Sequence, residues 1–353
     1  MRRNLTKSIE MSLLVIRTSS MGDVIMTLPL LRSFASAYPD EELVFVTKKP
    51  FDHFVSDNTG IRVFLSDHHG RHRGLGGLYR LWRELRAHYN ITAIADLHDV
   101  IRSKIVRTLF RLDGCRIAVI DKERALRRRL VRGRLSAPIT HTVERYRAVF
   151  ARAGYPLDSL PGPWLKPSPA GSKEASAQAE GKVRPLIGVA PLARHRLKMW
   201  PADRMEAMLR MLSAHCECTI FLFGSPDEAS TISEMASRVP GAIPVAGTIS
   251  LEGEIALISQ LTLMVAMDSS NMHLAAMLGV DTLSIWGATH PRAGFSAWGM
   301  PEENQIQIPD TQLTCRPCTI YGKGECRRGD LACLEWITPE MVLKRVLDRL
   351  KRE

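Results

Sequence analysis

Long hydrophobic runs are absent from this sequence of 353 residues. The most apolar stretch, residues 255–267, is interrupted by Ser259 and Thr262, so it cannot supply the roughly twenty apolar residues of a membrane-spanning helix. Residues 1–3 resemble the basic start of a signal peptide, but the apolar run at 13–16 is too short for its hydrophobic part. We therefore expect a cytoplasmic protein that is neither exported nor embedded in a membrane.

Aromatic residues are scarce where positive charge is densest. The net charge is +11, and residues 101–134 hold twelve Lys or Arg against three acidic residues, with Phe110 as their only aromatic residue. This excess implies an anionic partner, and nucleic acid, a phosphorylated glycolipid and an anionic membrane surface all fit it. Base stacking needs interleaved aromatics, so a nucleic-acid-binding protein is the weaker alternative and we expect no nucleic-acid partner.

An even set of cysteines is also lacking. The seven cysteines include Cys115, Cys216 and Cys218 in or beside expected core strands, which suits a reducing compartment. The other four lie in one segment with the spacing Cys-x2-Cys-x7-Cys-x6-Cys: Cys315, Cys318, Cys326 and Cys333. Four cysteines can form a tetrahedral zinc site. However, six residues separate the second pair, Cys326 and Cys333, whereas zinc sites of the usual kind have two closely spaced pairs. We expect no metal and keep structural zinc as the weaker alternative.

Short apolar runs alternate with helical patterns in both halves of the chain. Strands are expected at 13–16, 43–47, 62–65, 92–96, 115–119, 186–190, 219–223, 243–245, 263–267 and 282–285. Helices are expected at 23–38, 75–88, 100–112, 203–215, 229–238 and 339–349, the last with Thr338 as its N-cap. This alternation predicts an α/β fold with parallel sheets covered on both faces.

Residues 156–185 are rich in Pro, Gly, Ser, Ala and Lys, a composition typical of a linker. We therefore expect an N-terminal Rossmann-like domain at 1–155 and a second at 186–353 that includes the cysteine segment and the terminal helix. Ligands of such doubly wound sheets bind beyond the carboxyl ends of the strands. The site is expected in a cleft that the two domains face.

The first expected strand leads into a turn at Gly22 and an acidic residue, Asp23, at the start of a helix. Asp23 can serve as a general base at the mouth of the cleft. It can equally be an ordinary helix N-terminal residue that interacts with the helix dipole. Position alone does not decide between these.

Anion-binding candidates follow two strands of the second half. Lys198 precedes Trp200-Pro201 and is a compact cation of the kind that can bind an anion. Asp268 ends a strand, and the helix that starts at Ser269 and Ser270 can bind phosphate through its N–H groups. The alternatives are an exposed surface lysine and an ordinary helix start.

Several strings together resemble glycosyltransferase family 9, the lipopolysaccharide heptosyltransferases. The matching strings are Ile16-Arg17-Thr18-Ser19-Ser20-Met21-Gly22-Asp23-Val24-Ile25-Met26-Thr27-Leu28-Pro29, Ala95-Asp96-Leu97-His98 with Arg102-Ser103, His141-Thr142-Val143-Glu144-Arg145-Tyr146, Lys198-Met199-Trp200-Pro201, and residues 267–276. One departure is Ser270, which stands where the family more often has Gly, and this weakens the expectation of a close backbone approach to the diphosphate.

The resemblance implies an inverting transferase of GT-B architecture that moves a heptose from ADP-heptose to the inner core of lipopolysaccharide. It implies catalytic roles for Asp23 and Lys198. The implied donor-binding residues are Gly22, Glu228, Ile249, Asp268, Ser269, Ser270 and His273. The implied acceptor-binding residues are Ser20, His98, Arg102, Arg128, Arg129 and His141. Glu228 can instead be a helix cap, His273 a core residue, and each arginine part of a solvated face.

The donor is expected to be a substrate, with no cofactor, and the absence of an Asp-x-Asp motif argues against a metal-chelated diphosphate. The acceptor is expected to be an anionic glycolipid, reached by a monomer at the inner face of the inner membrane. An epimerase or a transferase that uses another nucleotide-sugar is the alternative on the same architecture.

Overall fold

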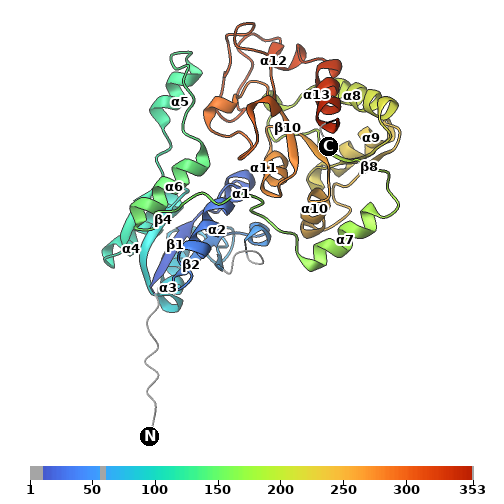
Figure 1. Cartoon of the computed structure of the whole chain (residues 1–353). Coiled ribbons are helices and arrows are strands. Elements are labelled where there is room, and N and C mark those ends of the chain that lie inside the picture. The colour runs from blue at the N-terminus through green and yellow to red at the C-terminus, as the bar shows by residue number, and fades with distance from the viewer. Residues whose placement is uncertain (1–10, 56–60, 352–353) are drawn as a thin grey trace. The chain divides into compact units, whose positions relative to one another are not determined.

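The computed structural model describes residues 11–55 and 61–351 (Figure 1), so the basic start at residues 1–3 lies outside the described part. The chain forms two compact units: unit 1 is Met1–Lys122 with Thr142–Pro161, and unit 2 is Glu123–His141 with Gly162–Glu353. This division differs from the expected boundaries, because residues 123–141 leave unit 1 and join unit 2. Within the described ranges, no helix combines the length and apolarity needed to cross a membrane.

Unit 1 contains a five-stranded parallel sheet in the order β3-β2-β1-β4-β5. Its strands are β1 (Ser12–Ile16), β2 (Glu42–Thr47), β3 (Arg62–Leu65), β4 (Ile91–Asp96) and β5 (Arg116–Val119). Every residue of β1 is buried, as expected for a central strand covered on both faces. The strand order reverses between β1 and β4, and ligands of open α/β sheets bind at the carboxyl ends of the strands at such a point.

The α-helices of unit 1 include two packed pairs. They are α1 (Met21–Ile25), α2 (Leu28–Ala37), α3 (Gly74–His88), α4 (Ile101–Leu112) and α6 (Thr142–Ala153), with a short 3₁₀ helix at Phe51–Phe54. α3 and α4 pack side by side, and α2 packs on α6. Leu81 of α3 and Phe110 of α4 share one core cluster with Leu14 and Ile94 of the sheet. α3 and α4 therefore cover the same face.

The predicted continuous helix over 23–38 is wrong in one respect, because it is broken between α1 and α2. Pro29 lies in the first turn of α2, and a proline inside a continuous helix would clash with the carbonyl four residues earlier and lack a donor. The Thr27 hydroxyl instead donates to the Val24 carbonyl oxygen at 2.7 Å. The break leaves the helix that starts beside Asp23 only five residues long.

Unit 2 contains a six-stranded sheet in the order β11-β10-β9-β6-β7-β8, in which every pair is parallel. Its strands are β6 (Leu186–Ala190), β7 (Thr219–Leu222), β8 (Ala242–Pro244), β9 (Leu263–Met267), β10 (Asp281–Ile285) and β11 (Gln305–Ile306). Counted from β6, this is the Rossmann order 3-2-1-4-5-6. The order reverses between β6 and β9, at the strands that lead to Lys198 and Asp268.

The α-helices of unit 2 are α5 (Arg124–Val131), α7 (Pro169–Ala179), α8 (Ala202–His215), α9 (Ala229–Ser237), α10 (Leu251–Ile258), α11 (Ser270–Met277), α12 (Ala332–Glu335) and α13 (Pro339–Leu350). Short 3₁₀ helices lie at Arg196–Lys198, Pro226–Glu228, Pro291–Ala293 and Glu302–Asn304. The Thr338 hydroxyl accepts a hydrogen bond from the Met341 N–H, which confirms the predicted cap of α13.

The segment expected as a linker contains the helix α7, which packs on α10. A Cβ on Gly171 would lie 2.2 Å from the Glu252 carbonyl oxygen, so this glycine permits close packing of the two helices. The Glu174 carboxylate accepts hydrogen bonds from the backbone and hydroxyl of Ser250, at 2.9 and 2.8 Å. The small residues that indicate a linker in the sequence are therefore used here for helix packing.

Residues 123–141 belong to unit 2 because their buried side chains pack there. The Arg127 guanidinium lies 4.9 Å from the ring centre of Phe295 and hydrogen-bonds the Tyr321 hydroxyl. Leu130 and Ile139 form a small apolar cluster with Ala293. α5 is thus anchored by its buried face to residues that lie far along the sequence.

Candidate functional site

The loop after β1 holds the Asp23 carboxylate through one oxygen. Asp23 Oδ2 accepts from Arg17 Nη2 at 2.6 Å and from the Ser20 hydroxyl and backbone N–H at 2.6 and 3.2 Å. Within the described part of the chain, Oδ1 makes no such contact, and 23% of the side chain is exposed. Gly22, predicted to bind the donor, lies next to Asp23 in the first turn of α1 in unit 1. One carboxylate oxygen is therefore fixed and the other is left for a ligand.

Opposing effects act on the pKa of the Asp23 carboxyl. Burial alone would raise it, but the charge of Arg17 and the hydrogen bonds from Ser20 and Arg17 outweigh burial and hold the pKa below its usual range. The carboxyl group is therefore ionised at neutral pH. It can accept a proton only when the donating group becomes strongly acidic, as a hydroxyl does while it forms a bond to carbon.

Arg17 is a site residue for which the sequence suggested no role. Its guanidinium is buried, donates from Nη1 to the Leu97 carbonyl oxygen at 2.5 Å, and lies 5.8 Å from the ring centre of Tyr146. The Tyr146 hydroxyl in turn contacts the Asp23 carbonyl oxygen at 3.4 Å. The signal available in the sequence was a cation that directly follows a buried strand and precedes an acid by six residues. Arg17 joins the loops after β1 and β4.

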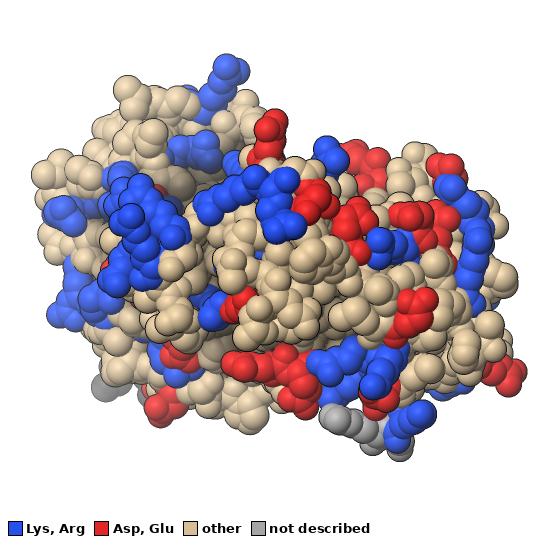
Figure 2. All heavy atoms as spheres, turned by 90° about the horizontal axis from the view of Figure 1, so that it is seen from above, with Lys and Arg blue, Asp and Glu red and all other residues tan. Residues whose placement is uncertain are grey.

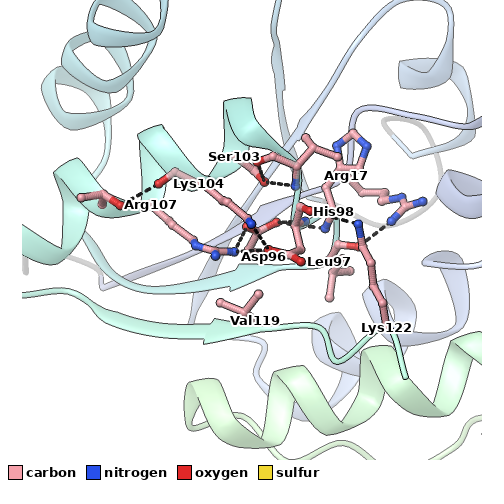
Figure 3. A network of polar contacts seen from close by, with 12 residues as sticks. Arg17, Asp96, Leu97, His98, Ser103, Lys104, Arg107, Val119 and Lys122 are labelled. Carbon is pink, nitrogen blue, oxygen red and sulfur yellow. Dashed lines mark hydrogen bonds and ion pairs between the residues drawn. The ribbon is translucent and has the colours of Figure 1, made fainter. Parts of the chain in front are cut away.

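Figure 3 shows how the loop after β4 is fixed by Asp96. The fully buried Asp96 carboxylate accepts from the backbone N–H groups of His98 and Asp99, at 2.9 and 2.8 Å, and from Arg107 Nη1 at 2.5 Å. Lys122 Nζ donates to the Asp99 carbonyl oxygen at 3.0 Å. The sequence suggested the Asp96 string but no role for Asp96 or Arg107. They hold the backbone that receives Arg17.

His98, predicted to bind the acceptor, is 6% exposed and contacts the loop after β1. Its Nδ1 lies 3.1 Å from the Thr18 hydroxyl and its Nε2 lies 3.2 Å from the Ser19 hydroxyl. Burial and the charge of Arg17 lower the His98 pKa to about 3. The ring is therefore neutral and connects the two loops, and its role toward an acceptor stays a prediction.

Arg102, also predicted to bind the acceptor, is exposed near the start of α4. It lines a small cavity with Thr18, His68 and His98. This cavity has about 10 Å³ of space for water-sized groups, roughly enough for one water molecule. A sugar acceptor would therefore have to bind outside it.

In unit 2, Lys198 is held beside Asp268. Lys198 Nζ lies 2.8 Å from Asp268 Oδ2 and donates to the Asp268 carbonyl oxygen at 3.2 Å. The Thr289 hydroxyl donates to the same carboxylate oxygen at 2.8 Å. The buried Trp200 indole anchors the lysine loop through a 3.0 Å hydrogen bond to the Ile337 carbonyl oxygen. Three loops at the carboxyl edge of the sheet thus meet at Asp268, and Thr289 is a contact that the sequence did not suggest.

The start of α11 is open to an anion. Ser269 is the N-cap, but its side chain makes no capping hydrogen bond, and its buried Oγ has no partner within residues 11–55 and 61–351. Ser270 begins the helix, which has no acidic residue in its first turn, and His273 is buried one turn further on. Backbone N–H groups at a helix start attract phosphate. The structure therefore brings Lys198, Asp268, Ser269 and Ser270 together.

Glu228 and Ile249 follow the neighbouring strands β7 and β8. Glu228 Oε2 accepts from the Ser225 backbone and hydroxyl at 2.7 and 2.8 Å, so the carboxylate caps a short helix, as the alternative interpretation expected. Ile249 is half-buried just before α10. Their donor-binding roles stay predictions.

The remaining acceptor candidates lie in unit 2. Arg128 and Arg129 are exposed on α5. The His141 ring centre lies 4.8 Å from that of Trp298, with the two rings tilted, and His141 Nε2 contacts the Ser296 carbonyl oxygen at 3.0 Å. Lys and Arg gather densely on one side of the face shown in Figure 2, whereas elsewhere they mix with Asp and Glu. The predicted acceptor residues are therefore divided, with Ser20, His98 and Arg102 in unit 1 and these three in unit 2.

The four cysteines considered for zinc are free thiols that pack on the core of unit 2. Burial raises the pKa of the Cys333 thiol to about 12. Among the described residues, no three His, Cys, Asp or Glu side chains are arranged to hold a metal ion. The zinc alternative gains no support from the structure.

Comparison with known proteins places this arrangement in context. The family model for glycosyltransferase family 9 (heptosyltransferase) matches residues 78–324. The chain is 26% identical to lipopolysaccharide heptosyltransferase 1 of Pseudomonas aeruginosa, over 87% of this chain and 86% of that protein.

Solved structures give the same indication for the fold. A family 9 glycosyltransferase from Veillonella parvula aligns with a TM-score of 0.76 at 19% identity, covering 97% of this chain and 98% of that one. An Escherichia coli ADP-heptose LPS heptosyltransferase II aligns with a TM-score of 0.67 at 20% identity, covering 97% and 99%. These similarities and the two parallel sheets confirm the predicted α/β fold class with two Rossmann-like doubly wound domains.

Proposed function

The chain belongs to glycosyltransferase family 9, as its motifs predicted, and from this premise we propose that it transfers a heptose from ADP-heptose to the inner core of lipopolysaccharide. The relative and one of the structural neighbours are lipopolysaccharide heptosyltransferases by name, and the neighbour's name gives ADP-heptose. Family membership also favours this function over nucleic-acid binding and over an epimerase.

The observation that carries the proposal is the pairing of an oriented base with a separate anion site. Asp23 is held by Arg17 and Ser20 through Oδ2. Lys198 lies beside the uncapped start of α11. A glycosyl transfer needs both functions, a base for the attacking hydroxyl and positive charge for the leaving diphosphate.

In the proposed reaction an acceptor hydroxyl oxygen attacks the anomeric carbon of the heptose. The bond from that carbon to the diphosphate oxygen breaks, ADP leaves with the electron pair, and the hydroxyl proton passes to Asp23 Oδ1. Attack opposite the leaving group inverts the anomeric carbon. Asp23 therefore acts on the acceptor, while Lys198 and the Ser269–Ser270 N–H groups stabilise the charge on ADP.

The charges around Lys198 support a donor site in unit 2. Lys198 is matched by Asp268 in the absence of ligand, so a diphosphate would compete for this lysine and leave Asp268 with Thr289. The unpartnered Ser269 hydroxyl would gain a phosphate oxygen as acceptor, and unsatisfied buried hydroxyls are costly. We assign the ribose to Glu228, the adenine to Ile249, and the sugar or diphosphate to His273, as the motifs imply.

The acceptor is proposed to be an anionic glycolipid at the inner face of the inner membrane. Arg102, Arg128 and Arg129 are exposed, and guanidinium groups bind carboxylates and phosphates through two parallel hydrogen bonds. Ser20 lies beside Asp23 at the same loop. The basic segment at residues 101–134 would then bind the anionic groups of a glycolipid.

A donor panel tests the function. Purified full-length protein is incubated with a Kdo-bearing lipid A acceptor and with ADP-heptose, UDP-GlcNAc or other sugar nucleotides, and products are weighed by mass spectrometry. We expect the acceptor to gain one heptose when ADP-heptose is the donor, and no sugar from the other donors. Transfer from a UDP-sugar without transfer from ADP-heptose would overturn the donor assignment. Mass analysis of the core from a deletion strain should show one missing sugar.

A further inference from the structure

One surface of unit 1 exposes apolar side chains at the beginnings of two neighbouring helices. Leu75 in the first turn of α3 is 74% exposed, and Ile101, the first residue of α4, is 77% exposed. Tyr79, one turn after Leu75, is 50% exposed. Isolated exposed apolar residues are ordinary, but these three lie in the first two turns of helices that pack side by side. We call Leu75, Tyr79 and Ile101 with the basic residues around them the Leu75–Ile101 surface.

The helix directions bring these side chains to one edge. α3 and α4 pack side by side, as seen in Figure 1, and each follows a strand of the same parallel sheet. A helix that connects parallel strands runs back against them, so both helices begin at the carboxyl edge of the sheet. The loops that carry Asp23 and His98 end strands β1 and β4 at this edge. The Leu75–Ile101 surface thus borders the acceptor side of the proposed site.

The charge of the two helices is mostly positive. Seven basic residues lie on the two helices: Arg80, Arg83, Arg86, Arg102, Lys104, Arg107 and Arg111. Glu84 is their single acidic residue. Its carboxylate is already bound by Arg71 and His72, at 2.8 and 3.2 Å. Three of the basic residues are also paired: Arg86 with Asp113 at 3.3 Å, Lys104 with Asp99 at 3.8 Å and Arg107 with Asp96 at 2.5 Å. Arg80, Arg83 and Arg102, which are exposed and form no ion pair with a described residue, carry the free positive charge.

We propose that the Leu75–Ile101 surface docks the protein on an anionic phospholipid bilayer. Apolar side chains surrounded by Lys and Arg bind the interface between headgroups and acyl chains, because the side chains enter the interface while the cations meet the lipid phosphates. A folded protein partner would need acidic groups placed to match Arg80, Arg83 and Arg102, whereas a bilayer supplies anionic groups continuously. Docking would bring a membrane-anchored acceptor to Asp23. The docking proposal rests on the proposed function in one respect, namely that the acceptor is anchored in the membrane.

The chain offers an internal control at the opposite end of α4. Leu112 is 80% exposed, even more than Ile101, but it is the last residue of the helix. At 1.5 Å per residue, the two lie roughly 16 Å apart along the axis. Leu112 is thus an equally exposed aliphatic side chain that the docked surface would leave in water.

Vesicle co-sedimentation tests the surface with the full chain. Wild-type protein should sediment with vesicles of phosphatidylcholine and phosphatidylglycerol, bind phosphatidylcholine alone weakly, and be released by salt, because screening weakens the attraction. Leu75→Gln/Ile101→Gln should weaken binding by roughly tenfold or more, since each buried aliphatic side chain contributes on the order of tenfold. Leu112→Gln should bind as wild type does. Arg80→Gln/Arg83→Gln should weaken binding by roughly fivefold per charge.

Equal binding to neutral and anionic vesicles, or an equal loss in Leu112→Gln, would overturn the proposal. Thermal melts check that the variants fold, which their exposed positions favour.

Activity separates this proposal from the proposed function. Leu75→Gln/Ile101→Gln should keep wild-type transfer to a water-soluble, deacylated acceptor and lose transfer to the acceptor in vesicles. If wild-type protein binds anionic vesicles but transfers no heptose to either acceptor, the proposed function fails and the docking surface stands. If transfer to both acceptors is equal in variant and wild type while binding is lost, docking has no part in catalysis.

Discussion

The helices α1 and α11 follow β-strands at equivalent edges of the two sheets, yet their first turns differ in charge. In α1 the Asp23 carboxylate accepts from the Ser20 backbone and hydroxyl, so the protein supplies its own anion to the helix start. In α11 the Ser269 hydroxyl makes no capping bond and no acid lies in the first turn. The start of α1 is therefore closed to an external anion, and the start of α11 is open to one.

In the proposed function, this difference lets two similar folds divide one reaction. A helix start attracts negative charge, and once a carboxylate occupies it, a phosphate is repelled and the carboxylate is held in place for proton transfer. A helix start without an internal anion remains a phosphate site. Lys198 adds a cation next to the open start only. Four substitutions test whether the closed start serves the acceptor and the open start the donor.

The largest effect is expected for Asp23→Asn, which keeps the shape of the side chain and removes the proton acceptor. Transfer should fall by as much as about 10⁴-fold, in line with the loss of a general base. ADP affinity, measured by calorimetry, should stay unchanged because Asp23 belongs to the closed start. Asp348→Asn, an exposed acid on α13, should have wild-type rates. Turnover of Asp23→Asn within a few-fold of wild type would sink the base assignment.

Lys198→Ala should lower kcat by about 10²–10³-fold, since it removes a cation that stabilises the leaving diphosphate. ADP binding should weaken as well, because the loss leaves Asp268 beside the phosphates without its ion pair. Initial rates and ADP titrations measure both effects. Lys344→Ala, an exposed lysine on α13, is the matched control. Unchanged kinetics in Lys198→Ala would refute the phosphate role.

Arg17→Gln should change the pH dependence of transfer. Arg17 lowers the pKa of Asp23, so its removal raises that pKa, and the acid limb of kcat/KM moves to higher pH. The loss of transfer is therefore large on the acid side and small at alkaline pH. Arg17→Lys retains the charge and should keep the limb near its wild-type position. A pH profile of Arg17→Gln that only scales down at every pH would indicate a merely structural role.

The smallest effect is expected for Ser269→Ala. The substitution removes one hydroxyl donor to phosphate, so ADP affinity should fall about threefold to tenfold. Ser20→Ala provides the comparison at the closed start and should leave ADP affinity unchanged while it slows transfer. If both serines alter ADP affinity equally, the distinction between the two helix starts is incorrect.

The sequence predicted the sheets well because their central strands are short, buried and β-branched. Every predicted strand appears, with bounds that differ by one residue or so, as in β2 and β7. The helix break before Pro29 was missed, although it was readable from the sequence because proline is poorly tolerated inside a helix. α7 was not readable, because its Gly and Ser residues favour a linker until the packing partner α10 is known.

The roles of Asp23, Lys198 and Asp268 stay proposals, but the residues themselves were identifiable from the strings that resemble the family. The supporting contacts were not. Arg17 reaches Leu97 across 80 positions of sequence, and Arg127 reaches Tyr321 across 194. Such contacts depend on how strands and loops are brought together, and no local pattern encodes them.

The excursion of residues 123–141 into unit 2 affects how the protein can be divided. The chain passes between units three times, near residues 122, 141 and 161, so unit 2 is not one continuous segment. A fragment that begins at Gly162 would expose Phe295 and Tyr321 without Arg127, and we expect it to aggregate. A chimera that exchanges donor halves between relatives must therefore carry α5 with the half it packs on, through three junctions rather than one.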